Sequence, residues 1–444
     1  MASAAEQLAS NLNFSAFAKA DELKRRIWFT LGALLVYRLG TYIPLPGINI
    51  AGLQQAFQQQ SQGILGMFNM FAGGAVGRMA IFALGIMPYI SASIIVQLMT
   101  TVIPQLESLK KEGEQGRKVI NQYTRYLTVV LAVVQSYGIA VGLEGSSSGI
   151  VTNPGWFFIF TAVVTLTGGT MFLMWLGEQI TSRGIGNGIS LIIFAGIAAG
   201  IPRALAGLLE LGRQGALSTG IIFGVAVLVV VVIALIVFME RAQRRLLIQY
   251  PKRQMGNRQF QGESSHLPLK LNSSGVIPPI FASSLLLLPT TIANFSAGRG
   301  PAWLGTVTAM LGHGQPLYML LYGLLIIFFS FFYTAIVFNP KDTADQLKKH
   351  GGFIPGIRPG ERTAAYIDYV LTRITVIGAI YILLVCLIPE FLIAQARLPF
   401  YFGGTSLLIV VSVTMDTVAQ IQGHLLAHQY EGLIKKSRLR GRKR

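Results

Sequence analysis

The sequence is poor in cysteine and in charge. It has 444 residues, of which one is a cysteine, 12% are charged and 52% are hydrophobic. A single cysteine excludes disulfide bonds within the chain. Because Cys386 lies in an apolar run, we interpret it as a small packing residue. Soluble domains are typically about one-quarter charged, so the composition excludes an ordinary soluble domain and predicts a multispan membrane protein.

Ionisable side chains are scarce in the middle of the apolar runs. Arg38 and Glu390 lie toward the ends of their runs, and Asp416 lies in the cytosolic third of the last one. Ion-coupled transporters normally place carboxylates or histidines near the membrane midplane. The sequence offers no such set, which is unfavourable for an ion-coupled mechanism.

Motifs for enzymatic chemistry and for metal binding are also missing. No G-x-x-x-x-G-K-[ST] run is present, so the chain does not hydrolyse nucleotides by that route. His424, His428 and Glu431 have helical spacing but lack a fourth ligand. We expect no enzymatic activity, no metal and no cofactor. Any energy that the function of this chain requires must therefore come from a partner or a gradient.

Ten apolar runs have roughly the 20-residue length of a spanning helix. They lie at residues 24–43, 79–101, 122–143, 154–177, 185–202, 218–239, 272–292, 317–338, 373–392 and 402–422. Residues 1–26 contain no short apolar core followed by a small-residue cleavage site, so we expect no secretory signal to be removed. We predict an all-α integral membrane protein with ten transmembrane helices, of which the first directs insertion.

Basic residues are distributed unevenly among the loops. All but six of the 36 Lys and Arg residues lie in the N-terminal segment, the C-terminal tail or the loops after the second, fourth, sixth and eighth spans. The exceptions are Arg38, Arg78, Arg203, Arg213, Arg299 and Arg397. Since cytosolic loops carry the excess of Lys and Arg, we predict that both termini are cytosolic.

Residues 67–99 read MFNMFAGGAVGRMAIFALGIMPYISASIIVQLM. A short helix-like piece breaks at Gly73 and Gly74, and a run of spanning length follows. Non-helical backbone at membrane depth is tolerated only inside protein or beside a water-filled cavity. Two interpretations remain: a re-entrant turn that only packs between helices, or a stopper that fills a cavity and can leave it.

Two basic loops and the seventh span have unusual sequences. The loop after the sixth span alternates apolar and polar residues at LLIQY and turns at MGNRQ, which predicts a hairpin that projects into the cytosol. The loop after the eighth span has Pro355 and Pro359 in a turn that directs Arg358 outward. These loops are also explained by topology and by contact with anionic lipid headgroups. In the seventh span, Pro278, Pro279 and Pro289 predict lost backbone hydrogen bonds and a bend.

Several long stretches resemble the SecY/Sec61-alpha family of protein-conducting channels. They are FNMFAGGA, FALGIMPYISASII, GEQITSRGIGNGIS, FFYTAIVFNP, GGFIPGIRPGERTA and PFYFGGTSLLIVV, in order between Leu23 and Gln422. The resemblance implies two inverted-topology halves, residues 23–202 and 218–422, around a central hourglass pore. An external connection at 203–217 joins the halves, and a cytosolic segment at 1–22 and a basic tail at 423–444 flank them.

The resemblance also implies a plug and a pore ring. The plug falls on residues 68–78, with Phe68, Asn69, Met70, Phe71, Gly73, Gly74 and Arg78. The ring falls on Ile86, Ile90, Ile189, Ile193, Ile280 and Ile409. Branched apolar side chains fit around a passing chain of any sequence and disfavour a continuous water column in its absence.

A lateral gate toward the lipid is implied between the second and seventh spans. Its expected polar contacts are Ser91, Gln97, Ser283 and Ser284. Apolar segments of a passing polypeptide, including signal sequences, would leave the pore there, because about 20 apolar residues favour lipid.

The cytosolic loops resemble docking surfaces for the ribosome and the SecA ATPase, with Arg358, Arg258 and Arg253 as expected contacts. Asn257 departs from the adjacent basic residues common in the family, and Pro279 departs from its more usual single proline. Further implied partners are SecE and SecG, and also SecDF, YidC and anionic lipids, in the bacterial inner membrane. The resulting hypothesis is a passive, gated polypeptide channel, and the alternative is a secondary transporter of small solutes.

Overall fold

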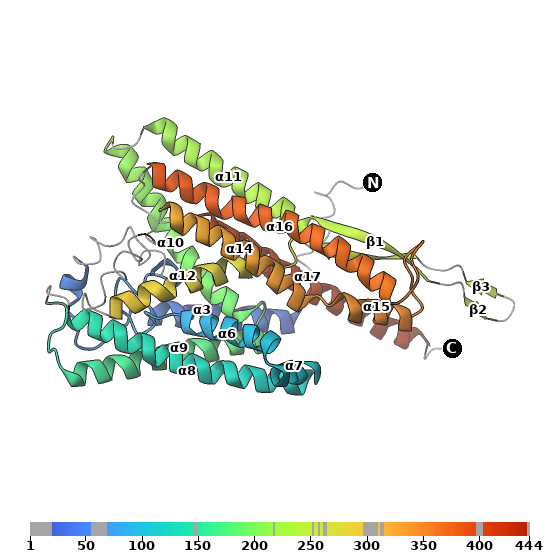
Figure 1. The fold of residues 1–444 in the computed structure, drawn as a ribbon, viewed down its shortest axis with the longest axis horizontal. Helices are drawn as coiled ribbons and strands as arrows, with labels where there is room; N and C mark the ends of the chain where they lie inside the picture. Colours follow the sequence, from blue (N-terminus) through green and yellow to red (C-terminus); the bar gives the residue numbers. More distant parts are fainter. Residues whose placement is uncertain are drawn as a thin grey trace. The chain divides into compact units, whose positions relative to one another are not determined.

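The computed structural model describes residues 20–54, 69–145, 149–215, 218–250, 253–255, 258–260, 264–295, 310, 315–396 and 403–441. This part of the chain is mainly helical, with four short strands (Figure 1). The longer helices are α3 (Asp21–Gly40), α6 (Met87–Val102), α7 (Pro104–Lys111), α8 (Glu114–Glu144), α9 (Trp156–Arg183), α10 (Gly188–Arg213), α11 (Thr219–Arg241), α12 (Ile277–Phe295), α14 (Pro316–Val337), α15 (Pro340–Lys349), α16 (Glu361–Ala396) and α17 (Gly404–Gly441). The strands are β1 (Gln243–Gln249), β2 (Arg253–Met255), β3 (Arg258–Phe260) and β4 (Ser264–Lys270).

Each predicted span overlaps one of these helices. Within the described residues, seven helices are long and apolar enough to cross a membrane, and an eighth span results if α6 and α7, which meet at a 98° bend, count as one. The two remaining runs coincide with α3 and α12. The predicted all-helical membrane architecture is confirmed, whereas the count of ten spans stays a prediction.

The second span begins later than predicted. Residues 72–86 are mostly turns, and α6 begins only at Met87, eight residues after the predicted start at residue 79. Gly85 has a φ of +55°, which interrupts a helix, and Pro88 lies in the first turn of α6, where its missing N–H costs nothing. A hydropathy pattern alone does not detect this late start.

The seventh span also begins later, at Ile277 and not at residue 272. Pro278 and Pro279 therefore lie in the first turn of α12, where a proline removes no intrahelical hydrogen bond. The predicted loss of helix hydrogen bonds at these two prolines is wrong.

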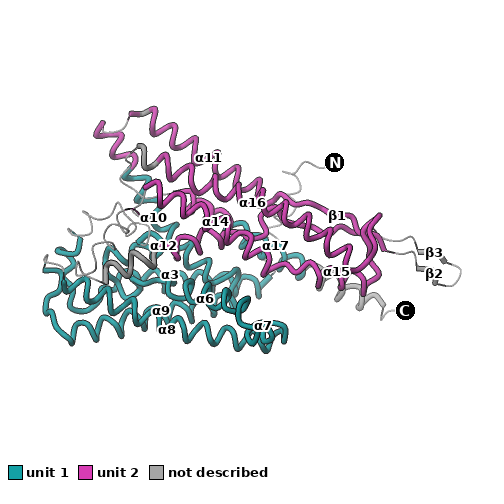
Figure 2. Tube along the Cα trace, in the orientation of Figure 1, with its two compact units in different colours: residues 1–207, 289–306, 413–444 teal, residues 208–288, 307–412 magenta. Residues whose placement is uncertain are grey.

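The chain divides into two compact units (Figure 2). Unit 1 comprises Met1–Gly207, Pro289–Thr306 and Val413–Arg444, and unit 2 comprises Leu208–Leu288 and Val307–Ser412. The predicted halves of the sequence stay a prediction.

In unit 1, α8 packs along α9, and α6 packs on α8. An apolar cluster joins the loop after α3 and the turns before α6 to α8 and α9. Its buried members are Leu45, Leu53, Met79, Ala83, Leu84, Ala140, Ile150, Phe158, Ala162 and Leu166. The turns before α6 are therefore part of the core of unit 1. They are not a loose connection.

In unit 2, α14 and α15 pack against α16, and the predicted hairpin is confirmed. Strands β1 and β4 pair antiparallel from Gln243↔Lys270 to Gln249↔Ser264. Beyond them, β2 pairs antiparallel with β3 from Arg253↔Phe260 to Met255↔Arg258, on either side of residues 256–257, which lie outside the described part of the chain. Apolar residues of the hairpin, of the loop after α15 and of α16 share one core, with Leu246, Leu269, Ile354, Ile367, Val370 and Ile374 as buried members.

Candidate functional site

Residues 69–86, here called the turn segment, begin with a short helical stretch and then fold back through two glycines. Gly73 and Gly74 have φ angles of +66° and +83°, which a side chain would strain. The Gly74 N–H donates to the Asn69 carbonyl at 2.7 Å, and the Asn69 side-chain oxygen accepts from the Gly77 N–H at 2.8 Å. The predicted break at the glycines is confirmed.

Backbone pairing attaches the turn segment to the loop after α3. The Leu45 N–H donates to the Met79 carbonyl at 2.9 Å, and the Ile81 N–H donates to the Ile43 carbonyl at 3.0 Å. Phe82, 3% exposed, stacks on Tyr37 of α3, with ring centroids 6.3 Å apart. These contacts satisfy polar backbone groups that lipid would leave unsatisfied.

The other side of the turn segment lies against α10 at Gly196. A Cβ atom added at Gly196 would stand 2.9 Å from the Phe71 carbonyl oxygen and 3.2 Å from the Gly73 nitrogen. Only a glycine permits this approach of helix to turn. Nothing in the spacing of the glycines along the sequence identified Gly196 as a contact of the turn segment.

The residues predicted for the plug are placed as follows. Phe71 and Gly73 are buried, and Asn69, Met70, Gly74 and Arg78 are half-buried. Phe68 lies outside the described residues. Arg78 donates from Nε to the Thr41 carbonyl at 3.1 Å and from Nη2 to the Gly73 carbonyl at 3.2 Å.

The isoleucines predicted for the pore ring lie in both units. In unit 1, Ile86, Ile90 and Ile193 are 5%, 6% and 5% exposed, and Ile189 is half-buried. In unit 2, Ile280 is 8% exposed and Ile409 is fully buried. None of the six is exposed, whereas Val230 on the apolar helix α11 is 65% exposed.

The polar residues predicted for the gate are buried or half-buried on α6 and α12. Ser91 is 6% exposed, and Gln97 donates to the Ser93 hydroxyl at 3.4 Å. Ser283 and Ser284 both donate to the Ile280 carbonyl of their own helix, at 2.9 and 2.8 Å. This back-bonding satisfies serine hydroxyls inside a helix and often bends it.

Arg358, the first predicted docking residue, is exposed at the tip of a well-anchored loop. Gly356 and Gly360 have φ angles of +82° and +113°, and the Thr363 hydroxyl donates to the Arg358 carbonyl at 2.9 Å. Phe353 and Gln249 exchange two backbone hydrogen bonds, which join this loop to the hairpin. The backbones of Arg253 and Arg258 lie in β2 and β3, and their side chains are outside the described part of the structure.

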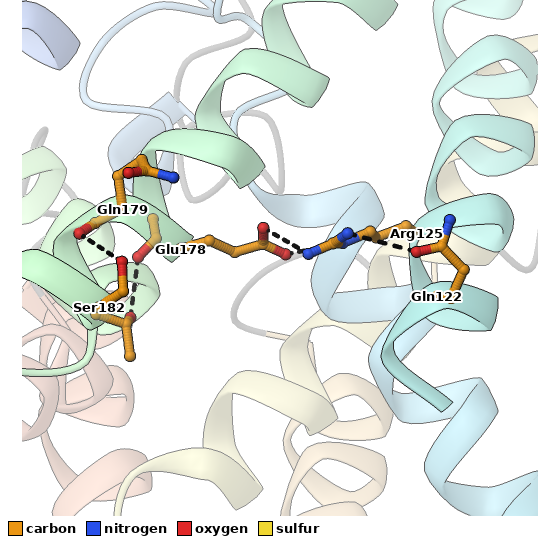
Figure 3. Close-up of polar contacts among 7 residues, drawn as sticks. Gln122, Arg125, Glu178, Gln179 and Ser182 are labelled. Carbon is orange, nitrogen blue, oxygen red and sulfur yellow. Dashed lines mark hydrogen bonds and ion pairs between the residues drawn. The ribbon is translucent and has the colours of Figure 1, made fainter. Parts of the chain in front are cut away.

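One ion pair was missed from the sequence. Arg125 of α8 donates to both carboxylate oxygens of Glu178 on α9, at 3.0 and 2.7 Å, as Figure 3 shows. Gln122 accepts from the same guanidinium at 3.4 Å. The two charges lie 53 residues apart in the sequence, so no local pattern connects them. A bidentate pair of this kind fixes two helices in orientation as well as in distance.

The comparisons with known proteins agree with this architecture. The SecY family model matches residues 80–418. The protein translocase subunit SecY of Escherichia coli (strain K12) is 59% identical over 430 residues, covering 96% of this chain and 97% of the relative. The same subunit of Vibrio cholerae is 56% identical over 431 residues and covers 96% of this chain and 97% of that protein.

Two solved structures show the same fold. One, described as the structure of a protein conducting channel, has a TM-score of 0.67 at 19% identity and covers 91% of this chain and 93% of its own. Sec61 in the canine ribosome-channel complex has a TM-score of 0.63 at 18% identity, with the same coverage. The relatives give no support to the alternative of a small-solute transporter. The chain is a multispan membrane protein that belongs to the SecY family of protein translocase subunits.

Proposed function

We propose that this chain forms the gated pore through which unfolded polypeptides cross the bacterial inner membrane. The observation that carries the proposal is the turn segment, whose non-helical backbone is packed into the core of unit 1 against helices long and apolar enough to cross a membrane. Such a backbone is stable only where protein surrounds it or water reaches it. In this proposal residues 68–78 fill the pore and can leave it, which meets the condition in both states, while Met79, Ala83 and Leu84 stay in the core of unit 1.

The six isoleucines form the constriction in this proposal. They present branched apolar side chains of similar size and no charge, so they contact any passing sequence equally. When no polypeptide is present, the same side chains and residues 68–78 exclude water and ions. Family membership supports this assignment.

Lateral release follows from the chemistry of α6 and α12. Ser91, Ser283 and Ser284 are small, and interhelical hydrogen bonds of such residues average only about 0.6 kcal/mol in membranes. A seam between two such helices opens at low cost. Signal sequences and other apolar segments then move into lipid, while polar segments continue across.

Docking of the driving partner takes place at the loops of unit 2, with both termini of the chain in the cytosol. Arg358 is exposed. Its loop shares an apolar core with the hairpin and α16, so a partner bound at Arg358 is mechanically connected to α16. We assign Arg358 first, and Arg258 and Arg253 second, to contacts with the ribosome or SecA. SecE and SecG complete the complex, SecDF and YidC act beside it, and anionic lipid headgroups contact the remaining basic residues.

The test is reconstitution of the chain with SecE and SecG in lipid vesicles. With SecA and ATP, an unfolded precursor should become protected from external protease. Deletion of residues 68–74 should raise the resting ion conductance of the same vesicles, because the pore loses its stopper. A resting conductance equal to that of the full chain would contradict the stopper, and absent protection would contradict the channel.

A further inference from the structure

Two arginines converge on one carbonyl group of the turn segment. Arg38, in the last turn of α3, donates from Nη1 to the Gly73 oxygen at 2.7 Å. Arg78 donates from Nη2 to the same oxygen at 3.2 Å. A carbonyl oxygen has two lone pairs, so both bonds form at once. The bond from Arg78 is internal to the turn segment, whereas the bond from Arg38 connects it to a neighbouring helix.

Tyr42 stabilises the two guanidinium groups beside each other. Its ring centroid lies 4.9 Å from the guanidinium carbon of Arg38 and 4.2 Å from that of Arg78. Arg38 also donates from Nη2 to the Tyr42 hydroxyl at 2.9 Å. Cation–π contacts of this kind attract a cation to the ring face. They offset part of the repulsion between the two arginines.

The arginines receive no compensation from acidic side chains in the described part of the chain. Arg38 and Arg78 make none of the ion pairs found there, and both Arg38 and Arg203 of α10 repel the charge of Arg78. The site therefore combines a short hydrogen bond, which favours the packed state, with repulsion between like charges, which favours separation. Only the bond from Arg38 has to break for the turn segment to separate from α3 at this site.

We propose that Arg38 is a latch residue that keeps the turn segment closed through the Gly73 carbonyl. This inference rests on the proposed function of residues 68–78 as a stopper. It assigns a positioning role to a residue of the first span, outside the stopper itself. Opening breaks the bond between Arg38 and Gly73, after which repulsion between Arg38 and Arg78 opposes return to the closed state.

The latch is tested by the resting ion conductance of the reconstituted complex. Arg38→Gln removes the charge and the short donor, and the conductance should rise by roughly ten- to one-hundred-fold, the range expected from losing one hydrogen bond made by a charged group. Arg38→Lys keeps the charge but presents a point donor in place of a planar fork, so it should restore part of the closure. Arg203→Gln is the matched control. It removes a charge that repels Arg78 but no bond to Gly73, so it should not raise the conductance.

Four outcomes would overturn the latch. Arg38→Gln could conduct no more than the unaltered chain while the deletion of residues 68–74 leaks, which would exclude the latch and retain the stopper. Arg203→Gln could leak as strongly as Arg38→Gln, which would assign the effect to charge alone. Arg38→Lys could leak as strongly as Arg38→Gln while its midpoint of thermal unfolding equals that of the unaltered chain. A positive charge at this position would then not restore closure. If the deletion itself does not leak, the proposed stopper is excluded, and the latch that rests on it is excluded with it.

Discussion

Single charged residues divide into two groups by their surroundings. Arg125 and Glu178 are each about one-third to two-fifths exposed and satisfy each other across two helices. Arg358 instead extends from a loop whose backbone is fixed by Thr363 and by Phe353. A fixed backbone with a free guanidinium is typical of a binding surface, because little conformational entropy is lost when a partner binds.

Replacing Arg358 with Glu should therefore impair SecA-driven export far more than membrane insertion of the chain itself. The substitution reverses a charge at the tip of the loop and leaves its apolar anchors, Ile354 and Ile357, in place. Export is measured as protease-protected precursor in reconstituted vesicles, and insertion as the amount of chain in the membrane. Lys348→Glu, an exposed charge reversal on α15, is the matched control. Equal export by the Arg358 and Lys348 variants would remove the docking role.

At the scale of elements, the contact between α10 and the turn segment depends on the absence of one side chain. Gly196 approaches Phe71 and Gly73 so closely that a methyl group would displace one of the two backbones. One turn further along α10, a Cβ atom added at Gly200 would meet nothing within 4 Å. The two glycines therefore form a matched pair on one helix.

Gly196→Ala should raise the resting ion conductance, since the added methyl group forces the turn segment away from α10. Gly200→Ala should leave it unchanged. Both substitutions replace glycine by alanine, the best helix former, and each stabilises the helical conformation of α10 by about 1 kcal/mol. A difference in conductance between the two variants therefore comes from the contact with the turn segment and not from helix propensity. Resting conductance of reconstituted complexes is the measurement. Identical conductance of the two variants would show that the turn segment does not seal the pore at this contact.

At the scale of the whole molecule, the proposed gate requires α6 and α12 to face each other. Ser91→Cys combined with Ser283→Cys, in a Cys386→Ala background, should form a crosslink in the resting state and block export. The control pair joins Ser91→Cys to Leu320→Cys, where Leu320 is 59% exposed on α14 and lies outside the proposed gate. It should not crosslink. Efficient export by a fully crosslinked Ser91/Ser283 variant would exclude the gate between these helices.

Composition and local pattern predicted the membrane architecture, the break at Gly73 and Gly74, and the hairpin after the sixth span. Those features depend on transfer free energies and turn preferences that each residue carries with it. The same properties explain why the start of α6 was misplaced. An apolar turn packed in protein has the same hydropathy as an apolar helix. The late start of α12 follows the polar residues Asn272, Ser273 and Ser274, which precede its first helical residue.

The long stretches shared with the SecY family identified the family, and 59% identity to a relative confirmed it. They did not reveal the neighbours of the turn segment. The sequence by itself determined that this chain enters a bilayer as apolar helices, because the free energy of transfer into lipid is a property of each side chain in a local run. Only the tertiary structure decided that Arg38, Gly196 and Ile43 meet the turn segment, because hydrogen bonds and close backbone contacts join residues far apart in the chain.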